Sequence, residues 1–561
     1  MSPAETEDPR ADLLYSSVPG LVASAAARFG DAEALVDGDL RLSFSELEAE
    51  SLRVSAAAMA AGISPGDRVA IWAPNMAEWV LAALGLLGLG AVLVPLNTRF
   101  KGPEAADVLK RSGARALFTV RGFLGLDYPA MLEEQDIPAL ERIILLRDDD
   151  EGTFSEPTRT DEVPIFGWRE FLAGAEGVVE GDGPLVGVAT DERAVMAAWR
   201  AVKPEDLSDL IFTSGTTGRP KGAMTSHGQT LRTFGTWASI VGLSEGDRYL
   251  IVNPFFHTFG YKAGIIACLI AGATIVPEPV FDVDRVLAKV AAERISMLPG
   301  PPTLYQSILD HPDRTAYDLS SLRLAVTGAA AVPVELILRM RSELTFSTVL
   351  TAYGLTEATG VVTICRRTDQ PEVISHSSGR AIPETEVTIV DDTGAALPVG
   401  QPGEILVRGY TVVSGYFEDP EATAAAIDAE GWLHTGDIGF MDPAGNVTIT
   451  DRLKDMFIVG GFNAYPAEIE GTLLRHPGVS QVAVVGVPDP RMGEVGCAFV
   501  VPRPGTDPAA LAEDLPAWAR EQMANYKVPR TVRIIEALPL NASGKVLKTE
   551  LRARAAKESR R

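Results

Sequence analysis

The sequence predicts an α/β protein, with a large N-terminal domain of two doubly wound sheets plus a small β-barrel, and a smaller α+β C-terminal domain. The length of 561 residues exceeds what a single hydrophobic core normally supports. Short apolar strands alternate with helical patterns in residues 12–122, and this rhythm, which is typical of parallel sheets, resumes from Tyr249. From about Gly379 the chain changes to short strands punctuated by Gly and Pro, which indicates antiparallel hairpins.

The strands of the predicted doubly wound sheets are short apolar runs. They occupy residues 68–72, 91–94, 116–120, 249–252, 274–276 and 324–326. The uncharged run 79–96 is long enough to suggest a membrane span, but it contains Gly85, Gly88 and Gly90 and leads into a β-branched strand. We interpret it as a buried helix of the core. The acidic, poorly periodic residues 147–206 predict a peripheral connection.

The N-terminal domain is predicted to span residues 1–451, with the β-barrel subdomain at about 379–450. The barrel strands are expected at 386–390, 403–408 and 446–450. Residues 452–561 predict the smaller α+β domain. Its helices are expected at 466–475 and 507–524, and its strands at 481–487 and 498–501.

Charge and composition narrow the function. A formal net charge of −25 argues against nucleic acid and anionic lipid as partners, and no stable membrane insertion is expected. It also means that an anionic ligand must be held by local positive side chains. The three cysteines match no metal-ligand spacing, and residues 1–10 are acidic, unlike a signal peptide, so a cytoplasmic location is expected. The sequence leaves open whether the protein forms a homodimer.

Residues 212–222, Phe-Thr-Ser-Gly-Thr-Thr-Gly-Arg-Pro-Lys-Gly, form the stretch with the clearest chemistry. They follow the apolar run 210–212, which predicts a short buried strand. Glycines let backbone N–H groups approach an anion, hydroxyl groups add donors, and Lys221 adds a compact positive charge. Gly218 is followed by Arg-Pro-Lys-Gly, so the spacing is not that of a Walker A loop. The stretch predicts a phosphate-binding loop of another kind.

This loop resembles the phosphate-loop signature of the acyl- and aryl-CoA synthetases, which belong to the adenylate-forming superfamily. Further stretches resemble motifs of the same family in the same order: Thr-Ala-Tyr-Gly-Leu-Thr-Glu at 351–357, Trp-Leu-His-Thr-Gly-Asp at 432–437, the long run 451–470, and Leu-Pro-Leu-Asn-Ala-Ser-Gly-Lys at 538–545. The resemblance implies activation of a carboxylic acid by ATP and Mg²⁺ to acyl-AMP, then thioester formation with coenzyme A. It also implies that the C-terminal domain is mobile and swings between the two half-reactions.

The resemblance assigns roles to individual residues of these motifs. Tyr353 would flank the adenine, Thr356 would contact the phosphates, and Glu357 would help to hold Mg²⁺. A carboxylate beside a triphosphate needs a hard cation between them. Asp437 would accept hydrogen bonds from both ribose hydroxyls, and Arg452 would contact ribose and phosphate.

The other implied site residues lie in the same motifs. In the phosphate loop they are Thr213, Ser214, Gly215, Thr216, Thr217, Gly218 and Lys221, with Thr216 also a predicted Mg²⁺ ligand; around the purine they are Gly328, Ala329, Ala330, Thr351, Ala352 and Gly354. Lys454 corresponds to the hinge, and Gly460 and Gly461 to the strand that lines the pantetheine tunnel. Lys545 corresponds to the catalytic lysine, which reaches the substrate carboxylate and the α-phosphate, so Lys545 and Thr356 are candidate catalytic residues.

The acid site is predicted in residues 253–264 and 299–305. His257 stands where the family places a histidine or aromatic residue near the substrate carboxylate, and a buried structural histidine is an equal alternative. Both segments are rich in apolar side chains, namely Phe255, Phe256, Phe259, Tyr261 and Leu304. Residues 253–264 contain no acidic side chain for an amino group, so a hydrophobic acid is favoured over acetate or an amino acid.

Residues 253–264 and 298–312 resemble most an actinobacterial subgroup that activates the indane-propanoate left when the sterol A and B rings have been degraded. A medium- or long-chain fatty acid and an aryl acid remain alternatives. Coenzyme A is favoured as the thiol because only 16 residues follow Lys545, too few for a carrier domain. A separate acyl carrier protein as acceptor, and a nucleotide-binding regulator without catalysis, are the other hypotheses.

Overall fold

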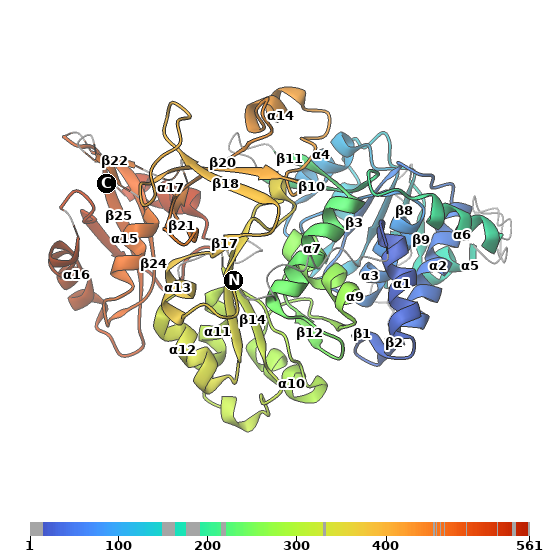
Figure 1. Ribbon diagram of the computed structural model, residues 1–561, viewed down its shortest axis with the longest axis horizontal. Coiled ribbons are helices and arrows are strands. Elements are labelled where there is room, and N and C mark those ends of the chain that lie inside the picture. The colour runs from blue at the N-terminus through green and yellow to red at the C-terminus, as the bar shows by residue number, and fades with distance from the viewer. Residues whose placement is uncertain are drawn as a thin grey trace.

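The structure is a computed structural model that describes residues 15–147, 163–174, 191–214, 220–328, 332–452, 455, 457–459, 462–464, 466–489, 491–523, 525–540 and 546–558. Its elements form two β-sheets covered by helices, a separate antiparallel sheet, and a C-terminal α+β part (Figure 1). This arrangement confirms the predicted α/β fold class.

The first large sheet has seven strands in the order β11-β10-β4-β3-β5-β8-β9. In chain order they are β3 (Arg68–Trp72), β4 (Val92–Pro95), β5 (Ala116–Thr119), β8 (Arg142–Leu145), β9 (Ile165–Gly167), β10 (Leu207–Ser214) and β11 (Pro220–Ser226). All pairs are parallel except the hairpin of β10 with β11. The strand β9 lies in the region that the sequence indicated as a peripheral connection, and it forms one edge of this sheet.

The second large sheet is built from two sets of strands. One set is β12 (Arg248–Ile251), β13 (Thr274–Pro277), β1 (Glu33–Asp37) and β2 (Leu40–Ser43); the other is β14 (Leu324–Gly328), β15 (Thr348–Tyr353), β16 (Thr363–Ile364) and β17 (Arg380–Ala381). Met297 joins the sets by parallel bridges to Tyr249 and Leu324. The N-terminal hairpin β1–β2 therefore belongs to the second sheet, although it precedes the first sheet in the chain.

Helices cover both large sheets. They are α1 (Val18–Phe29), α2 (Phe44–Ala60), α3 (Ala77–Gly88), α4 (Gly102–Ser112), α5 (Trp168–Ala173), α6 (Glu192–Ala201), α7 (His227–Val241), α8 (Thr258–Gly260), α9 (Ala267–Ala271), α10 (Val283–Glu293), α11 (Pro302–Leu309), α12 (Val334–Glu343) and α13 (Pro371–His376). Short turns of other types are the 3₁₀-helices η2 (Ala130–Leu132), η5 (Arg314–Ala316) and η6 (Thr356–Ala358), and the π-helix η4 (Tyr261–Ile266). A small hairpin joins β6 (Arg121–Phe123) to β7 (Leu126–Asp127).

The uncharged run 79–96 forms the buried helix α3 and the strand β4, as predicted. A Cβ atom on Gly85 would lie 2.6 Å from the Val54 side chain, and one on Gly88 would lie 2.1 Å from that of Trp199. Glycine at these positions therefore lets the neighbouring helices approach closely. Among the described residues no helix is long and apolar enough to cross a membrane.

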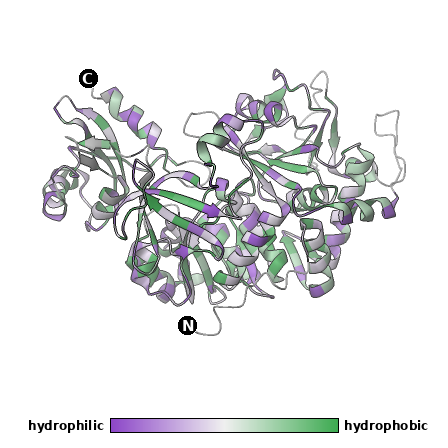
Figure 2. Cartoon of the chain, turned by 45° about the horizontal axis from the view of Figure 1, so that its top comes forward, coloured by the Kyte–Doolittle hydropathy of each residue, from purple (hydrophilic) through white to green (hydrophobic). Residues whose placement is uncertain are grey.

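The antiparallel part predicted from Gly379 is a four-stranded sheet with its own apolar core. Its strands are β18 (Thr385–Val390), β19 (Gly403–Gly409), β20 (Leu433–Met441) and β21 (Val447–Arg452), and α14 (Pro420–Ala426) lies between β19 and β20 in the chain. The centre of β19, residues 405–407, is apolar and buried, and Figure 2 shows hydrophobic and hydrophilic residues mixed along the chain. The sheet places β20 and β21 beside each other just before the predicted hinge.

The C-terminal part has a further core and a five-stranded sheet. Its elements are β22 (Phe457–Val459), β23 (Phe462–Ala464), α15 (Pro466–Leu473), β24 (Val479–Asp489), β25 (Gly493–Pro502), α16 (Pro508–Gln522), β26 (Thr531–Ile534) and α17 (Lys548–Glu558). Figure 1 shows these elements at the end of the molecule opposite α2, α5 and α6. The boundary after residue 451 stays a prediction, as does any motion about it.

Candidate functional site

The phosphate-loop strand β10 and the short helix η6 meet through their side chains. Thr213, near the end of β10, donates a hydrogen bond from its Oγ1 to Glu357 Oε1 at 2.9 Å. Glu357 lies in η6, which begins three residues after the end of β15. The carboxyl ends of these two strands therefore bring together two motifs that the sequence analysis predicted to surround the phosphates. In open α/β sheets, ligands bind in this position.

A tyrosine that the sequence analysis did not single out completes this contact. Tyr416 donates a hydrogen bond from its hydroxyl group to the same Glu357 Oε1 at 3.0 Å. The Nζ atom of Lys221 lies 5.1 Å from the centre of the Tyr416 ring, within the range of a cation–π contact. Burial, reinforced by the neighbouring Glu357 carboxylate, raises the pKa of Tyr416 well above its usual value. Tyr416 therefore stays a hydrogen-bond donor at neutral pH.

The segment around Tyr416 is fixed by its backbone to the return strand of the phosphate loop. The N–H of Phe417 donates to the carbonyl oxygen of Gly222 at 2.8 Å, and the N–H of Met224 donates to that of Gly415 at 3.0 Å. The N–H of Tyr416 itself donates to Thr423 Oγ1 at 2.9 Å. Tyr416 thus acts as an extension of β11. A local sequence signal for it, an aromatic residue after a glycine in a turn, is too common to identify it.

The predicted adenine and ribose residues also contact each other. Tyr353, at the end of β15, donates a hydrogen bond from its hydroxyl group to Asp437 Oδ2 at 2.6 Å. Asp437 lies in β20 with 5 % of its surface exposed, and its backbone N–H donates to Thr435 Oγ1. The strand register places Asp437 opposite Arg452 of β21. The motif at 432–437 and the start of the run 451–470 therefore adjoin the motif at 351–357.

Small residues crowd the ends of β14 and β15. These strands are parallel and pair Gly328 with Ala352. A Cβ atom on Gly328 would lie 2.7 Å from the carbonyl oxygen of Ala352, and one on Gly354 would lie 2.0 Å from that of Gly360. Neither position has room for a side chain, so the backbone forms the surface here. This is suited to a flat ring such as a purine.

The two threonines of the motif at 351–357 have different surroundings. The Oγ1 of Thr351 donates to the carbonyl oxygens of Ile374 and Ser377, at 2.8 Å each. Its hydroxyl group therefore anchors α13, and its predicted nucleotide contact stays a prediction. Thr356 is 7 % exposed at the start of η6, beside Glu357.

His257 caps the short helix α8. Its Nδ1 accepts a hydrogen bond from the backbone N–H of Phe259 at 3.2 Å. In the neutral imidazole the proton is then on Nε2, which makes that atom a donor. A tight backbone holds the residue, because a Cβ atom on Gly260 would lie 2.1 Å from the carbonyl oxygen of Pro254. The structure thus gives His257 a local structural role, and its contact with a substrate carboxylate stays a prediction.

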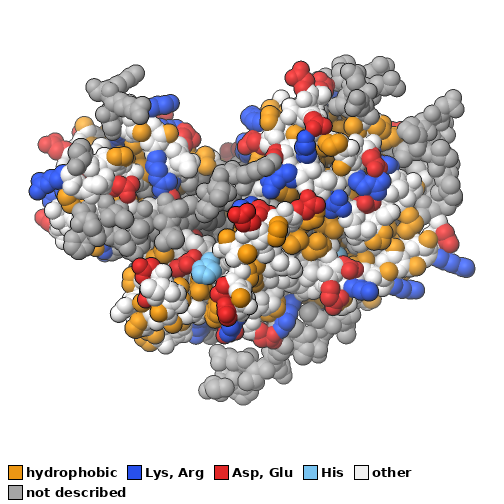
Figure 3. Space-filling model, turned by 90° about the horizontal axis from the view of Figure 1, so that it is seen from above, with side chains coloured by type: hydrophobic (Ala, Val, Ile, Leu, Met, Phe, Trp, Pro, Cys, Tyr) orange, Lys and Arg blue, Asp and Glu red, His pale blue; other side chains and the backbone are white. Residues whose placement is uncertain are grey.

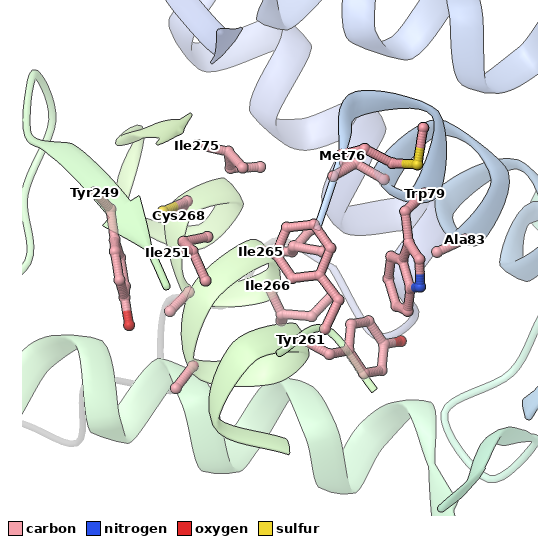
Figure 4. Packing of buried hydrophobic residues seen from close by; sticks show 14 of the residues in the cluster. Met76, Trp79, Ala83, Tyr249, Ile251, Tyr261, Ile265, Ile266, Cys268 and Ile275 are labelled. Carbon is pink, nitrogen blue, oxygen red and sulfur yellow. The ribbon is translucent and has the colours of Figure 1, made fainter. Parts of the chain in front are cut away.

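The apolar side chains predicted to line the acid site divide into two groups. Phe255 and Tyr261 are buried and their rings lie 5.1 and 5.7 Å from that of Trp79, so they pack in the core. Figure 4 shows Tyr261 beside Trp79. Phe259 is half-buried, and Phe256 and Leu304 keep 8 and 3 % of their surface exposed. Phe255 and Tyr261 therefore pack the segment against the core. Phe256, Phe259 and Leu304 remain as the candidate lining of the acid site.

Several predicted site residues lie outside the described residues. They are Gly215, Thr216, Thr217 and Gly218 of the phosphate loop, Ala329 and Ala330, the predicted hinge Lys454, Gly460, Gly461 and Lys545. The side chains of Ser214 and Arg452 are likewise outside the description. The roles of these residues stay predictions.

The side-chain groups around Glu357 that could bind a cation are oxygen atoms. Within the described part of the chain, no group of three or more His, Cys, Asp or Glu side chains could hold a metal ion. A cation at Glu357 would therefore take most of its ligands from a bound phosphate and from water, which is how Mg²⁺ usually binds. On the face seen in Figure 3 acidic and basic side chains are interspersed.

Comparisons with known proteins identify the family of the chain. The family model described as AMP-binding enzyme matches residues 22–417, and the model of the C-terminal domain of AMP-binding enzymes matches residues 468–545. A 3-[(3aS,4S,7aS)-7a-methyl-1,5-dioxo-octahydro-1H-inden-4-yl]propanoyl:CoA ligase from Rhodococcus jostii (strain RHA1) is 51% identical over 542 residues, which cover 96% of this chain and 98% of the relative. The ligase of the same name from Mycobacterium tuberculosis is 49% identical over 539 residues, covering 96% of this chain and 98% of the relative.

A solved structure extends the comparison to the fold. The anthranilate CoA ligase AuaEII in complex with anthranoyl-AMP has a TM-score of 0.84 and 27% sequence identity. The match covers 99% of this chain and all of the other.

Proposed function

The chain belongs to the AMP-binding enzyme family, and from this premise we propose that its acid substrate is a bicyclic, sterol-derived propanoate. The enzyme is an AMP-forming acyl-CoA synthetase that uses ATP, Mg²⁺ and coenzyme A. It activates a hydrophobic carboxylic acid to acyl-AMP and then forms the CoA thioester. The observation that carries the proposed substrate is the identity of about half of all residues, over nearly the full length, with two ligases named for the indane-propanoate.

The candidate lining of the acid site supports this substrate. Phe256, Phe259 and Leu304 offer apolar and aromatic surface, which suits a rigid bicyclic ring better than a charged or very small acid. No carboxylate in residues 253–264 would pair with an amino group. His257, with Nε2 as donor, is proposed to hold the substrate carboxylate.

We propose that Glu357 holds Mg²⁺, assisted by Thr216, whose position is not described. Carboxylate and hydroxyl oxygens are ligands that Mg²⁺ accepts, so the donor set around Glu357 fits this ion. When bound, Mg²⁺ offsets the negative charge of the departing pyrophosphate. Thr213 and Tyr416 hold the carboxylate in place through their hydrogen bonds to Oε1.

The proposed reaction joins two negatively charged partners. A carboxylate oxygen attacks the α-phosphorus of ATP, and the bond from that phosphorus to pyrophosphate breaks. Lys221 is proposed to stabilise the pyrophosphate and Lys545 to bridge the carboxylate and the α-phosphate, so most of the catalysis is positioning and electrostatics. The thiol of coenzyme A then loses its proton and attacks the acyl carbon, and the bond to AMP breaks.

The substrate is tested by measuring acid-dependent pyrophosphate release with matched acids. The set contains the indane-propanoate, octanoate, ferulate and acetate at equal ATP, Mg²⁺ and coenzyme A. We expect the highest kcat/KM for the indane-propanoate, by at least about tenfold, because its ring system buries several more apolar carbons than the others can against the same lining. A higher kcat/KM for octanoate would make the enzyme a fatty acyl-CoA synthetase and would reject the proposed substrate.

The acceptor thiol is tested with the same assay. Coenzyme A is expected to convert acyl-AMP to the thioester, whereas accumulation of acyl-AMP in its presence would indicate a separate acyl carrier protein. Release of no pyrophosphate with any acid would support a regulator. We infer a cytoplasmic location, which is consistent with the buried free thiols of Cys268, Cys365 and Cys497.

Substitution of Tyr416 by Phe is expected to raise the Mg²⁺ concentration for half-maximal pyrophosphate release by about tenfold, because a hydrogen bond to a charged group is worth roughly 1.5–3 kcal/mol and Thr213 retains the other one. The measurement is a Mg²⁺ titration at saturating ATP. Tyr317→Phe, the same change in the segment after η5, is the matched control. An unchanged titration would show that Tyr416 does not position Glu357.

A further inference from the structure

A fully buried ion pair connects the phosphate-loop strand to the segment that follows His257. The Nζ atom of Lys262 lies 2.9 Å from Asp209 Oδ1, and both side chains are 0% exposed. Asp209 is in β10, and Lys262 is in the π-helix η4. Single-turn π-helices in proteins occur frequently at functional sites.

The pair is surrounded by buried polar side chains. Ser208 donates a hydrogen bond from its Oγ to Asp209 Oδ2 at 2.7 Å. Among the described residues, Tyr261 Oη and His227 Nε2 are buried without a hydrogen-bond partner. Burial lowers the pKa of His227 to about 4, so this imidazole is neutral at pH 7. Burial also lowers the pKa of Lys262, whereas the adjacent Asp209 carboxylate opposes that shift and favours the charged ammonium group.

Stability alone does not explain this pair. Transferring two charges from water into the core costs several kcal/mol each, and well-packed apolar side chains of similar volume are often as stable as the pair. Apolar side chains that could pack against such replacements are also present, since Ile265 and Ile266 of η4 and Trp79 of α3 are buried (Figure 4). A role in positioning is therefore the better explanation.

Asp209 lies on the strand of the predicted phosphate loop, and Lys262 lies in the predicted acid-binding segment. Asp209 is held on both sides by strand pairing, with Leu93 of β4 and Thr225 of β11, and it precedes Thr213 by four residues on the same strand. Lys262 follows His257 by five residues in a segment whose backbone is tightly folded. Moving one reacting group by about 1 Å can cost about 10²-fold in rate, so the distance between these segments matters for catalysis.

We propose that the Asp209–Lys262 pair is a positioning device that holds the acid-binding segment 253–264 at a set distance from the phosphate-loop strand β10. Neither residue touches a substrate. The inference rests on the proposed function only in taking residues 253–264 as the acid site, and it does not depend on which acid is bound.

The pair acts on one half-reaction in particular. In adenylation the acid and ATP are separate molecules, and their alignment depends on the relative position of the two segments. In thioester formation the acyl group and AMP are already joined by a covalent bond, so the same misalignment has little effect. A general structural defect would reduce both half-reactions.

The test is the double substitution Asp209→Asn with Lys262→Met, which removes both charges and leaves neither one unpaired. We expect a folded enzyme, a Kd for MgATP within about twofold of the wild type, and kcat for acid-dependent pyrophosphate release lowered by about 10–100-fold. Conversion of supplied acyl-AMP and coenzyme A to thioester should stay within about twofold, since positioning no longer limits it. Wild-type kcat for pyrophosphate release, or equal loss of both half-reactions, would overturn the proposal.

The matched control is Glu278→Gln with Lys289→Met. Glu278 is also 0% exposed, and its carboxylate lies 2.7 Å from Nζ of Lys289, which is 25% exposed, and pairs with Arg285 as well; these contacts join the end of β13 to α10. It should leave both half-reactions unchanged. A rate loss equal to that of the first double variant would show that any buried pair has this effect and would overturn the proposal.

A second variant, Asp209→Glu, keeps both charges and lengthens one side chain by a methylene. We expect a smaller loss of the same kind, about three- to tenfold in adenylation alone, because the distance changes while the attraction remains. Wild-type adenylation in this variant overturns the proposal even if the double variant does not fold. Failure of both to fold would make the pair a folding requirement, which also overturns it. Rates are compared as variant to wild type with the best acid of the panel, so a wrong substrate assignment alters neither ratio.

Discussion

Substitution of Lys545 by Ala is expected to lower acid-dependent pyrophosphate release by about 10²–10³-fold while supplied acyl-AMP is still converted to the CoA thioester. Lys545, the last residue of the motif at 538–545, is the predicted bridge between the substrate carboxylate and the α-phosphate. Its positive charge matters only while these two anions are brought together, so its loss should spare the second half-reaction. Both half-reactions are measured separately, by pyrophosphate release and by thioester formation.

The control for this substitution is Lys557→Ala. Lys557 is an exposed lysine in α17. It carries the same charge as Lys545 and follows it by twelve residues in the sequence. It should leave both half-reactions unchanged. Equal loss of the two half-reactions in Lys545→Ala would contradict the assignment of this residue to adenylation.

Substitution of Glu357 by Gln is expected to lower pyrophosphate release at fixed Mg²⁺ by about 10²–10³-fold. The amide preserves the size of the side chain and can still accept hydrogen bonds from Thr213 and Tyr416, but it has no charge to bind a hard cation. Binding of Mn²⁺ in the presence of ATP, measured by electron paramagnetic resonance, should weaken in parallel. This reading does not depend on turnover.

The exposed Glu372 in α13 provides the comparison for Glu357. Glu372→Gln removes the same charge from the surface and should change neither the rate nor Mn²⁺ binding. If Glu357→Gln retained wild-type Mn²⁺ binding, the ion would have to be held elsewhere, and the proposed role of Glu357 would be wrong.

Local patterns predicted the strands of the fold well and their partners less well. The strand β3 is observed at its predicted bounds, residues 68–72, because a short apolar run between turns specifies a buried strand by itself. The pairing of β1 with β13, through Leu35 and Ile275, could not be predicted. It joins segments far apart in the chain, and neither segment carries a signal that names the other.

In the candidate site, too, residues within local motifs were predicted, whereas contacts that depend on the pairing of distant segments were not. The resemblance identified Thr213 and Glu357, and the structure places them in hydrogen-bond contact. Tyr416 was missed because its position depends on backbone pairing with Gly222 and Met224, which no motif describes. The π-helical turn at residues 261–266, which brings Lys262 to Asp209, was missed because its periodicity differs from that of an α-helix only over a few residues.

The ladder between β20 and β21 has a consequence for the way the C-terminal domain would move. Asp437 and Arg452 are opposite each other in this ladder, and the predicted hinge Lys454 follows two residues later. A rotation at that hinge would have its axis beside the nucleotide sugar rather than at a remote point. The AMP moiety would then serve as a stationary pivot, so that one adenylate could be presented to two different faces of the turning domain without being released.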